Sequence, residues 1–459
     1  MNPIQVELLR LRKYINYYSI YLMNNRRLLT GLLSAVLSGG GVCSYAQTVM
    51  TLEEIFRKAE SNSVQLRPSF TAQSEAEREI EVARSGKLPE VNAALSLSYI
   101  GDGFTTKRNF SDLQKAPIPP LGTGLTLNVA QPVYTGGALT RTTELAELKL
   151  TSARYAADFQ RDNIRFQLAG FYFDIYKYTN LKKVVEGNIA SAREVLKDMK
   201  ARYEQGTSLL NDITRYELLV SNLELQLVKI NNTIDILNTN LVTIAGFPDG
   251  TVIVPDSSIL VRSLPVEGER WWQREAMQNA PSLSLARSGV DMSRKAESIV
   301  RSGRLPKVSL QAGWSVDGPI LVEVPPINRN LSYWYVGLGV SYDISSLYKN
   351  NKSLAKSRAA TQKAVDDLAV AQENVSLAVR ADYVRYMEAY EELKALRKSV
   401  ELAEQNYHTT STRYSAGMAL VTDMLDAADA RLDAEQRLIN ARIGIIYYYY
   451  KLLFIAGKI

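Results

Sequence analysis

The sequence has almost none of the side chains that most catalytic and metal sites need. It contains one cysteine, Cys43, and one histidine, His408, which argues against a transition-metal site built from thiolate and imidazole. It also lacks a phosphate-binding loop, a nucleophile elbow and a dinucleotide fingerprint. An enzyme would have to use carboxylates alone, such as Asp366 with Asp367, and such pairs on a helix are usually a solvated face. The sequence therefore predicts no enzyme activity, no cofactor and no metal site.

Neither sign of charge dominates the sequence. The formal net charge is +6, and residues 1–46 hold five basic residues and one acidic residue. The rest of the chain is therefore nearly neutral, and no basic patch marks a nucleic-acid surface. We expect no nucleic-acid partner.

Residues 1–46 have the pattern of a signal peptide with an upstream extension. The basic pair Arg26-Arg27 precedes the apolar run 28–37, and Ser44-Tyr45-Ala46 resembles a cleavage site. A short transmembrane anchor is the alternative, but the run is about half the length that a membrane span needs. Cys43 either leaves with this segment or carries a lipid. Export of this kind is typical of a bacterial envelope protein.

Proline is missing from residues 137–246, and both glycine and proline are missing from residues 348–416. Both stretches are rich in good helix formers. Each predicts a long helix that reverses at Gly206 or Gly417, because only glycine adopts positive φ without a steric penalty. The first helix alone would be about 100 Å long, which is more than one soluble domain needs. We therefore expect two long helical hairpins, over 137–246 and 348–457.

The helix that returns after Gly206 carries two further signals. Asn211 or Asp212 stands where an N-cap residue is expected. Nine apolar residues then recur in steps of three and four, which predicts a seam for a coiled-coil partner. They are Tyr216, Val220, Leu223, Leu227, Ile230, Ile234, Leu237, Leu241 and Ile244.

Three motifs occur twice in the same order, about 211 to 217 residues apart. Ser85-Gly86-Lys87-Leu88-Pro89 returns as Ser302-Gly303-Arg304-Leu305-Pro306. Arg202-Tyr203-x-x-Gly206-x-x-Leu209-x-x-Asp212 returns as Arg413-Tyr414-x-x-Gly417-x-x-Leu420-x-x-Asp423, and Ile244-Ala245-Gly246 returns as Ile455-Ala456-Gly457. We therefore expect a first structural repeat at 47–264, with a linker at 247–264, and a second at 265–459. Thr51 and Glu54 predict a capping box where the first repeat begins.

Four segments change from the helical period to alternation of apolar and small polar residues. They are 91–100, 121–133, 308–317 and 331–344. Each is long enough to cross a bilayer as a tilted strand, and aromatic residues gather near the ends. Soluble hairpins packed on the helices are the alternative. In a membrane, four strands cannot close a barrel, and open edges would leave backbone groups unpaired, so several chains would have to share one barrel.

Motifs at both ends of the strands connect this sequence with a known family. Leu88-Pro89-x-Val91 enters a strand, Gln131-Pro132-Val133-Tyr134-x-Gly136-Gly137 leaves one, and the Arg-Tyr-x-x-Gly turn ends with aspartate twice. In these motifs, and over essentially all of the mature chain, the sequence resembles the TolC-type outer-membrane efflux family. The resemblance implies an α+β membrane protein with two internal repeats. Four strands per chain would form part of a shared outer-membrane β-barrel that continues into a long periplasmic α-helical barrel.

The resemblance also implies a function. A homotrimer in the outer-membrane lipid of a Gram-negative bacterium, extending into the periplasm, would be the passive exit duct of a tripartite efflux or type I secretion system. Its helical turns would dock a periplasmic adaptor (membrane fusion) protein, and an inner-membrane pump would supply the energy. A non-conducting periplasmic coiled-coil scaffold is the alternative function, and the alternation in the four strand segments argues against it.

Carried over residue by residue, the resemblance places the functional site at the two turns. The adaptor-docking tip would comprise Tyr203, Gly206, Thr207, Gly417 and Met418. The periplasmic gate would comprise Asp212, Asp423, Asp426 and Tyr414, with the carboxylates ringing a constriction and attracting cations. Plain capping of the returning helices is the alternative role for Asp212 and Asp423.

The sequence departs from the family at one position of the gate. The resemblance implies a closed tip held by a tyrosine, an aspartate and an arginine two residues after the turn glycine. Tyr414 and Asp212 are present, but the arginine position is Ala419. Any such lock in this chain must therefore use other partners.

Overall fold

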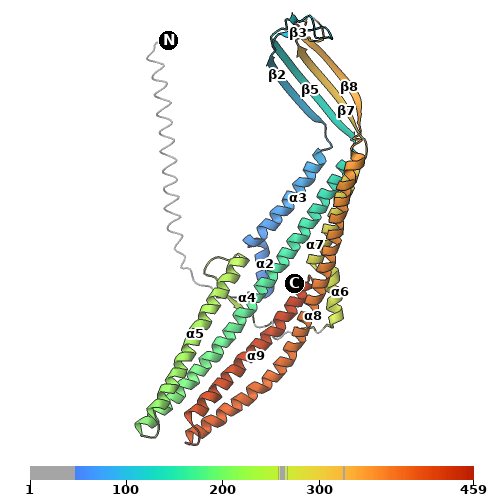
Figure 1. The fold of residues 1–459 in the computed structure, drawn as a ribbon. Helices are drawn as coiled ribbons and strands as arrows, with labels where there is room; N and C mark the ends of the chain where they lie inside the picture. The colour runs from blue at the N-terminus through green and yellow to red at the C-terminus, as the bar shows by residue number, and fades with distance from the viewer. Residues whose placement is uncertain (1–46, 257, 259–263, 266, 324–325) are drawn as a thin grey trace, which may run out of the picture.

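The computed structural model describes residues 47–459 except 257, 259–263, 266 and 324–325. The predicted signal peptide and Cys43 lie outside the described residues. The described chain is long and narrow, with a sheet at one end and helices along the rest of its length (Figure 1). The turns of both helical hairpins lie together at the end opposite the sheet.

Four long helices form the two hairpins. In the first, α4 spans Ala138–Glu204 and α5 spans Leu210–Ala245. In the second, α8 spans Ser346–Ser415 and α9 spans Val421–Ile455. α4 has 67 residues and α8 has 70, so each is about 100 Å long. The chain reverses at Gly206 and Gly417, as the sequence predicts, with φ of 74° and 77°.

Shorter helices precede each pair of strands. α2 (Leu52–Asn62) begins with the predicted capping box, in which Thr51 N donates to Glu54 Oε2 at 2.8 Å and Glu54 N donates to Thr51 Oγ1 at 3.3 Å. A 3-10 turn at Val64–Leu66 leads into α3 (Arg67–Ser85). In the second half, α6 (Glu269–Asn279) leads into α7 (Pro281–Ser302).

Four strands form one antiparallel sheet in the order β2-β5-β7-β8. They are β2 (Glu90–Tyr99), β5 (Leu121–Tyr134), β7 (Lys307–Gly318) and β8 (Leu331–Ser341). β5 and β7 join the two halves of the chain, and β2 and β8 are the edges. The prediction that the last strand continues to residue 344 is wrong. Asp343 Oδ1 accepts hydrogen bonds from Ser345 N at 3.0 Å and Ser345 Oγ at 2.6 Å, and this turn leads directly into α8.

The expected linker at 247–264 contains a strand that the sequence analysis missed. β6 (Val252–Pro255) pairs in parallel with β1 (Gln47–Met50). Asn238 of α5 fixes it, because Nδ2 donates to Thr251 O at 2.8 Å and Oδ1 accepts from Ile253 N at 2.9 Å. Four residues are too few to show a clear period. Two more short strands, β3 (Gly103–Thr105) and β4 (Gln114–Ala116), pair in the loop between β2 and β5.

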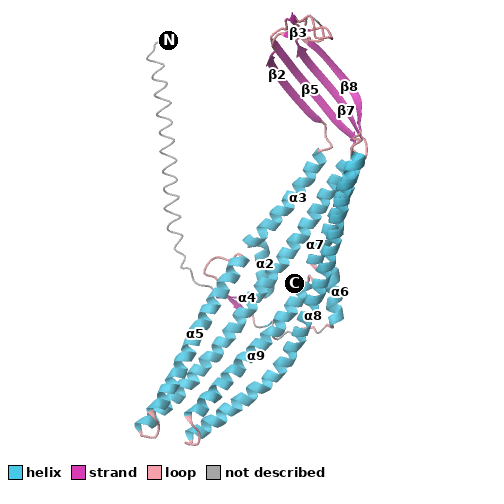
Figure 2. Ribbon diagram, viewed as in Figure 1, coloured by secondary structure: helices cyan, strands magenta, loops and turns pink. Residues whose placement is uncertain are grey.

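The helices pack side by side as one layer (Figures 1 and 2). Next to the sheet the neighbours follow the order α3-α4-α7-α8, and toward the turns they follow α5-α4-α9-α8. Buried apolar clusters join them around Leu168 of α4, around Tyr216 of α5 and around Trp272 of α6. Next to the sheet and near the turns, α8 is therefore one edge of the layer, while α3 and then α5 form the other edge. Between these two parts, α6 packs against α8.

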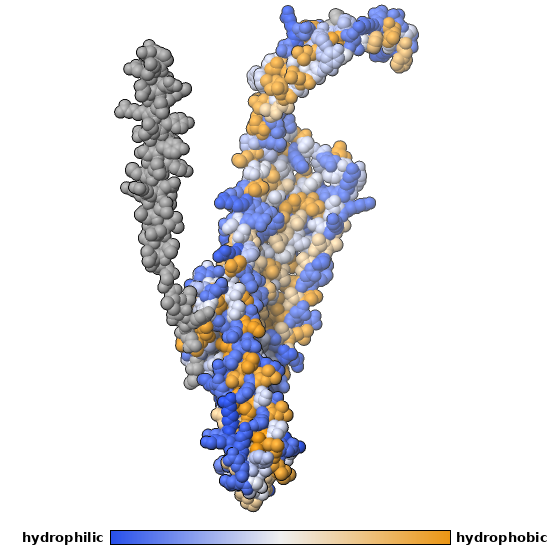
Figure 3. Space-filling view, turned by 90° about the vertical axis from the view of Figure 1, so that its left-hand side faces the viewer, coloured by the Kyte–Doolittle hydropathy of each residue, from blue (hydrophilic) through white to orange (hydrophobic). Residues whose placement is uncertain are grey.

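Many apolar side chains remain exposed. On the edge strands, Leu95 is 71% exposed and Trp334 is 74% exposed. Figure 3 shows hydrophobic surface on the sheet and also along the helices. None of the helices in the described ranges has an apolar stretch of the length needed to cross a membrane.

Candidate functional site

The two turns at the far end of the hairpins share one backbone design. Thr207 N donates to Arg202 O at 2.9 Å in the first turn, and Met418 N donates to Arg413 O at 2.7 Å in the second. Hydrogen bonds of this kind, past a left-handed glycine, satisfy the last carbonyls of a helix. A Cβ at Gly206 or Gly417 would meet nothing within 4 Å. Positive φ, rather than crowding, is therefore what requires glycine at these positions.

The residues predicted to dock a partner lie on the outer surface of the turns. Tyr203 is 44% exposed and Met418 is 66% exposed. Three leucines beside them, Leu209, Leu210 and Leu420, are exposed by 68%, 60% and 70%. Gly206, Thr207 and Gly417 are exposed as well. Apolar side chains gathered on an exposed surface are typical of a protein-binding site.

Asp212 and Asp423 occupy matching places in the first turns of α5 and α9. The prediction that Asn211 or Asp212 is the N-cap is wrong, because α5 begins at Leu210 and Leu209 is the cap. Asp423 does satisfy the end of its helix, since its Oδ2 accepts from Leu420 N at 3.0 Å. Acidic residues in a first turn are also favoured by the helix dipole. A capping role and a role in a gate remain compatible for Asp423.

The other two predicted gate residues have acidic neighbours. Partial burial and the charge of Asp426 raise the pKa of Asp429 on α9. Burial raises the pKa of Tyr414, and Asp212 is among the charges close to that phenol. The structure therefore brings Tyr414 of one hairpin close to Asp212 of the other. It also places a further carboxylate, Asp429, beside Asp426, and no pattern in the sequence predicted it.

Arg202 connects the two turns, and sequence reasoning missed it. Its Nη2 donates to Ser415 O in the second turn at 2.9 Å. Its guanidinium lies 5.8 Å from the centre of the Tyr414 ring, and Asp198 Oδ2 accepts from its Nε at 2.8 Å. The side chain thus holds the second turn through one hydrogen bond and one cation–π contact. No local sequence pattern could reveal a contact between residues that are 213 positions apart.

A second arginine joins the hairpins above the turns. Arg431 of α9 donates from Nη2 to Asn188 Oδ1 of α4 at 2.6 Å, and its guanidinium lies 3.9 Å from the centre of the Tyr407 ring. Asn188 Nδ2 in turn donates to Glu435 Oε2 at 3.0 Å. Asn188 is only 7% exposed, so this network is shielded from competing water. Two arginines, at two heights, therefore hold the hairpins of one chain together.

Comparison with known proteins decides the family. A model of outer membrane efflux proteins matches residues 55–247 and 272–445, which make up most of the chain and include α4, α5, α8 and most of α9. The chain belongs to the outer membrane efflux protein family. The resemblance seen in the sequence is thereby confirmed, and this efflux protein is an outer-membrane protein that extends into the periplasm.

Curated relatives and a solved structure match nearly the whole length of the efflux protein. The outer membrane protein TolC of Vibrio cholerae is 27% identical over 427 residues, which cover 92% of this chain and 93% of the relative. TolC of Escherichia coli is 22% identical, over 92% of this chain and 84% of the relative. The crystal structure of the outer membrane protein VceC from Vibrio cholerae has a TM-score of 0.71 at 16% identity, covering 88% and 96% of the two chains. The efflux protein therefore shares the fold of the outer membrane protein VceC.

Proposed function

We propose that three copies of this efflux protein form one outer-membrane channel-tunnel, the passive exit duct of a tripartite efflux or type I secretion system. The observation that carries the proposal is the sheet of four strands with two unpaired edges, β2 and β8. In lipid, each unpaired backbone group costs several kcal/mol. Pairing β8 of one copy with β2 of the next would satisfy both edges. Three copies of four strands give twelve, which exceeds the minimum of about eight for a closed membrane barrel.

The edges of the helical layer support the same closure. On α8, Val370, Leu377 and Val384 recur every seven residues and are 56%, 59% and 55% exposed. On α5, Leu218 and Leu225 are 61% and 54% exposed and are also seven residues apart. Apolar residues at this spacing form the seam of a coiled coil. Joining the α8 edge of one copy to the opposite edge of the next, where α5 lies near the turns and α3 lies nearer the sheet, would bury both stripes and close the helices around a hollow tunnel.

The turns would be the periplasmic tip of the tunnel. We assign adaptor docking to Tyr203, Gly206, Thr207, Gly417 and Met418, because the apolar side chains around them are exposed. An inner-membrane pump would drive export, because docking and gating by these residues are passive and release no energy. Asp212, Asp423, Asp426 and Tyr414 would line the gate, where carboxylates from three copies attract cations.

Arg202 would replace the lock arginine that is missing at Ala419. Its contacts with Ser415 O and the Tyr414 ring join the two hairpins of a copy at the tip. We propose that these contacts keep the resting tip narrow, and that docking of the adaptor loosens them. Asp198 would orient the guanidinium for this role.

Two measurements on the full-length detergent-solubilised protein test the proposed function. Light scattering is expected to give a particle of three chains, and planar bilayers are expected to show ion conductance. A single chain that keeps its helical content in solution would overturn the assembly. A particle of three chains that never conducts would favour the scaffold over the channel.

A further inference from the structure

The part of α8 next to the sheet carries a stripe of lysines, of which Lys363 pairs with Asp367 Oδ2 at 2.7 Å. Residues 344–365 include five basic residues and no acidic residue. Four of them, Lys349, Lys352, Lys356 and Lys363, are exposed, and their spacing of three, four and seven places them on one helix face. Lys352 and Lys356 form no ion pair within the part of the chain that the structure describes. A stripe of like charges is unfavourable unless another surface neutralises it.

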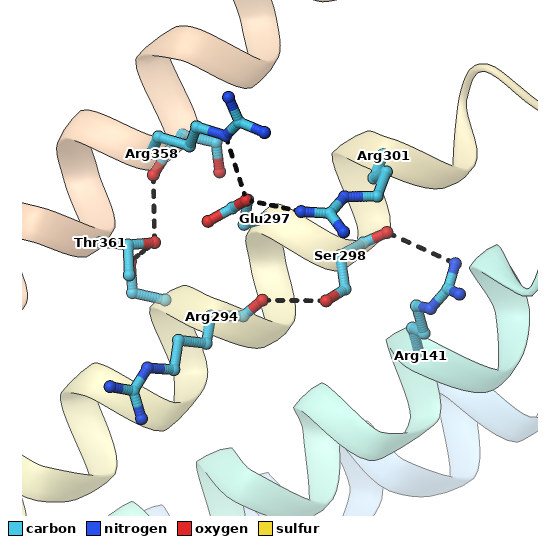
Figure 4. Close-up of polar contacts among 9 residues, drawn as sticks. Arg141, Arg294, Glu297, Ser298, Arg301, Arg358 and Thr361 are labelled. Atoms are coloured by element: carbon cyan, nitrogen blue, oxygen red, sulfur yellow. Dashed lines mark hydrogen bonds and ion pairs between the residues drawn. The ribbon is translucent and has the colours of Figure 1, made fainter.

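The lysine stripe faces away from the rest of the chain. The inner side of α8 packs on α7, where Arg358 Nε lies 3.5 Å from Glu297 Oε1 (Figure 4). Leu354, which is 5% exposed, also lies on this inner side. Because α8 is the edge of the layer, the lysines point toward whatever lies beside the molecule. If copies join edge to edge, that neighbour is α3 of the next copy.

The contact between α4 and α7 inside one chain is a template for this contact between copies. Positions in α8 follow their counterparts in α4 by 211 residues, as the Arg-Tyr turn motif indicates. Leu168 and Val379, which are related by this offset, are both buried. Positions in α7 follow those in α3 by 217 residues, as Ser85 and Ser302 indicate. A ring of copies would therefore bring α8 against α3 in the way that α4 already meets α7.

Two polar contacts define the template. Arg141 Nη1 donates to Gly136 O at 2.9 Å and to Ser298 O of α7 at 3.4 Å (Figure 4). One turn further, Lys295 Nζ of α7 donates to Glu144 Oε2 of α4 at 2.8 Å. Arg141 and Ser298 therefore mark positions that face each other across a pair of antiparallel helices.

Arg141 of α4 corresponds to Lys352 of α8, 211 residues later. Ser298 of α7 corresponds to Glu81 of α3, 217 residues earlier. A cation on α8 would thus face an acid on α3 of the next copy. The Glu81 side chain is 64% exposed, and among the described residues its carboxylate pairs with Arg78 of its own helix, at 2.9 Å. One turn deeper, Lys356 becomes level with Glu77, whose carboxylate lies 3.9 Å from Arg154. Lys352 therefore becomes level with Glu81 and Lys356 with Glu77, whereas the second template contact becomes Ala355 and Arg78 and carries no ion pair.

We propose that an ion pair between Lys352 of one copy and Glu81 of the next sets the register of the assembled channel just below the membrane. This inference rests on the proposed function, because it needs copies that join edge to edge. Charge complementarity of this kind selects the partner and its register more than it adds affinity. The pair would prevent α8 from sliding by one helical turn along α3 while the apolar edges of the helices come together.

Cross-linking of full-length protein in membranes tests the pairing directly. In a Cys43→Ser background, Lys352→Cys with Glu81→Cys is expected to give linked dimers and trimers on denaturing gels after treatment with a short bismaleimide. Arg141→Cys with Ser298→Cys is the matched control, and it is expected to link only within a chain. Ala359→Cys with Glu81→Cys is shifted by about 10 Å along α8 and is expected to link far less.

The size of the untreated particle separates the two ways in which this experiment could fail. A single chain by light scattering would refute the proposed assembly itself. A particle of three chains that does not link through Lys352→Cys and Glu81→Cys, or links equally well through the shifted pair, would overturn the pairing. Lysines that bind anionic phospholipid headgroups instead would give that result.

Charge reversal adds a test that does not depend on thiol chemistry. Lys352→Glu or Glu81→Lys alone is expected to lower the fraction of trimer after dilution at low salt, by roughly two- to fivefold per contact. The double variant is expected to restore it, and the differences are expected to shrink at high salt. Failure of the double variant to restore the trimer would contradict the pairing.

Discussion

Asp162 of α4 is a carboxylate held in an unfavourable place. It is 4% exposed, and Arg161 Nε lies 3.6 Å from its Oδ1. Burial raises its pKa above the usual range, and the charge of Arg161 only partly opposes this. The folded state therefore binds the proton more tightly than the unfolded chain does. Ionisation of Asp162 costs stability above the unfolded pKa of about 3.9, and this cost is absent below it.

We predict that Asp162→Asn raises the melting temperature at neutral pH. The advantage over the wild type is expected to shrink as the pH falls toward about 3.9, because the wild-type carboxyl is then protonated in both states. Thermal unfolding followed by circular dichroism between pH 4 and 8 measures this. Asp235→Asn, at an exposed position on α5, is the control and is expected to show no such trend. Equal melting curves for Asp162→Asn and the wild type at every pH would refute the prediction.

Arg202 is the residue on which the closed tip is expected to depend. Arg202→Ala removes the hydrogen bond to Ser415 O and the contact with Tyr414, so the two turns of a copy should separate more readily. We expect a larger mean conductance in planar bilayers. A hydrogen bond to a charged donor is worth about 1.5 to 3 kcal/mol, which is roughly a tenfold or greater shift in an open-to-closed ratio.

The control for Arg202 is Arg193, an exposed arginine of the same helix. Arg193 Nη2 donates to Glu224 Oε1 at 2.6 Å, which links α4 only to α5 within one hairpin. Arg193→Ala should leave the conductance unchanged. Equal conductance for Arg202→Ala and Arg193→Ala would remove Arg202 from the lock.

At the scale of the element, the hairpin turns depend on glycine for backbone reasons alone. Gly417 has φ of 77° and open space around it. Gly417→Val forces a β-branched residue into a conformation that costs about 1–2 kcal/mol. We expect a distorted turn, weaker adaptor binding by surface plasmon resonance and reduced drug export in cells.

Gly170, inside α4, gives the opposite expectation. It also has nothing within 4 Å of an added Cβ, but it is helical. Gly170→Ala should therefore stabilise the helix by up to about 1 kcal/mol and leave adaptor binding unchanged. Full export by Gly417→Val would count against a docking role for the second turn.

These elements also show which parts of the fold can be predicted from the sequence. The long helices, their turn glycines and the capping box at Thr51 rest on local rules, and they were predicted correctly. β6 was missed because its partner, β1, lies about 200 residues away and neither strand shows a period. The links made by Arg202 and Arg431 were missed because each joins residues that are distant in sequence, and only packing brings those residues together. Periodicity predicts elements well, but it does not predict which polar side chains connect them.

At the scale of the whole molecule, the sheet and the helical layer have the same unfinished edges. β8 and α8 lie on one side of the chain, while β2, α3 and α5 lie on the other. An interface between one side of a copy and the opposite side of the next leaves a free surface at each end unless the copies form a closed ring. In the proposed ring of three copies, each acidic side chain near the turns would occur three times at the same height. Its charge then acts on the pore as a set rather than as a single group.

We predict that Asp423→Asn with Asp426→Asn lowers the cation preference of the channel. Both residues lie within the first two turns of α9, so a ring of copies would concentrate their charges at the tip, where cations are attracted and anions repelled. Reversal potentials in planar bilayers under a salt gradient measure this preference. Asp433→Asn is the control, because Asp433 lies further along α9 and pairs with Arg437 Nε at 2.9 Å. Unchanged selectivity in the double variant would remove Asp423 and Asp426 from the gate, whereas an equal loss in the control would place the selective charge elsewhere on α9.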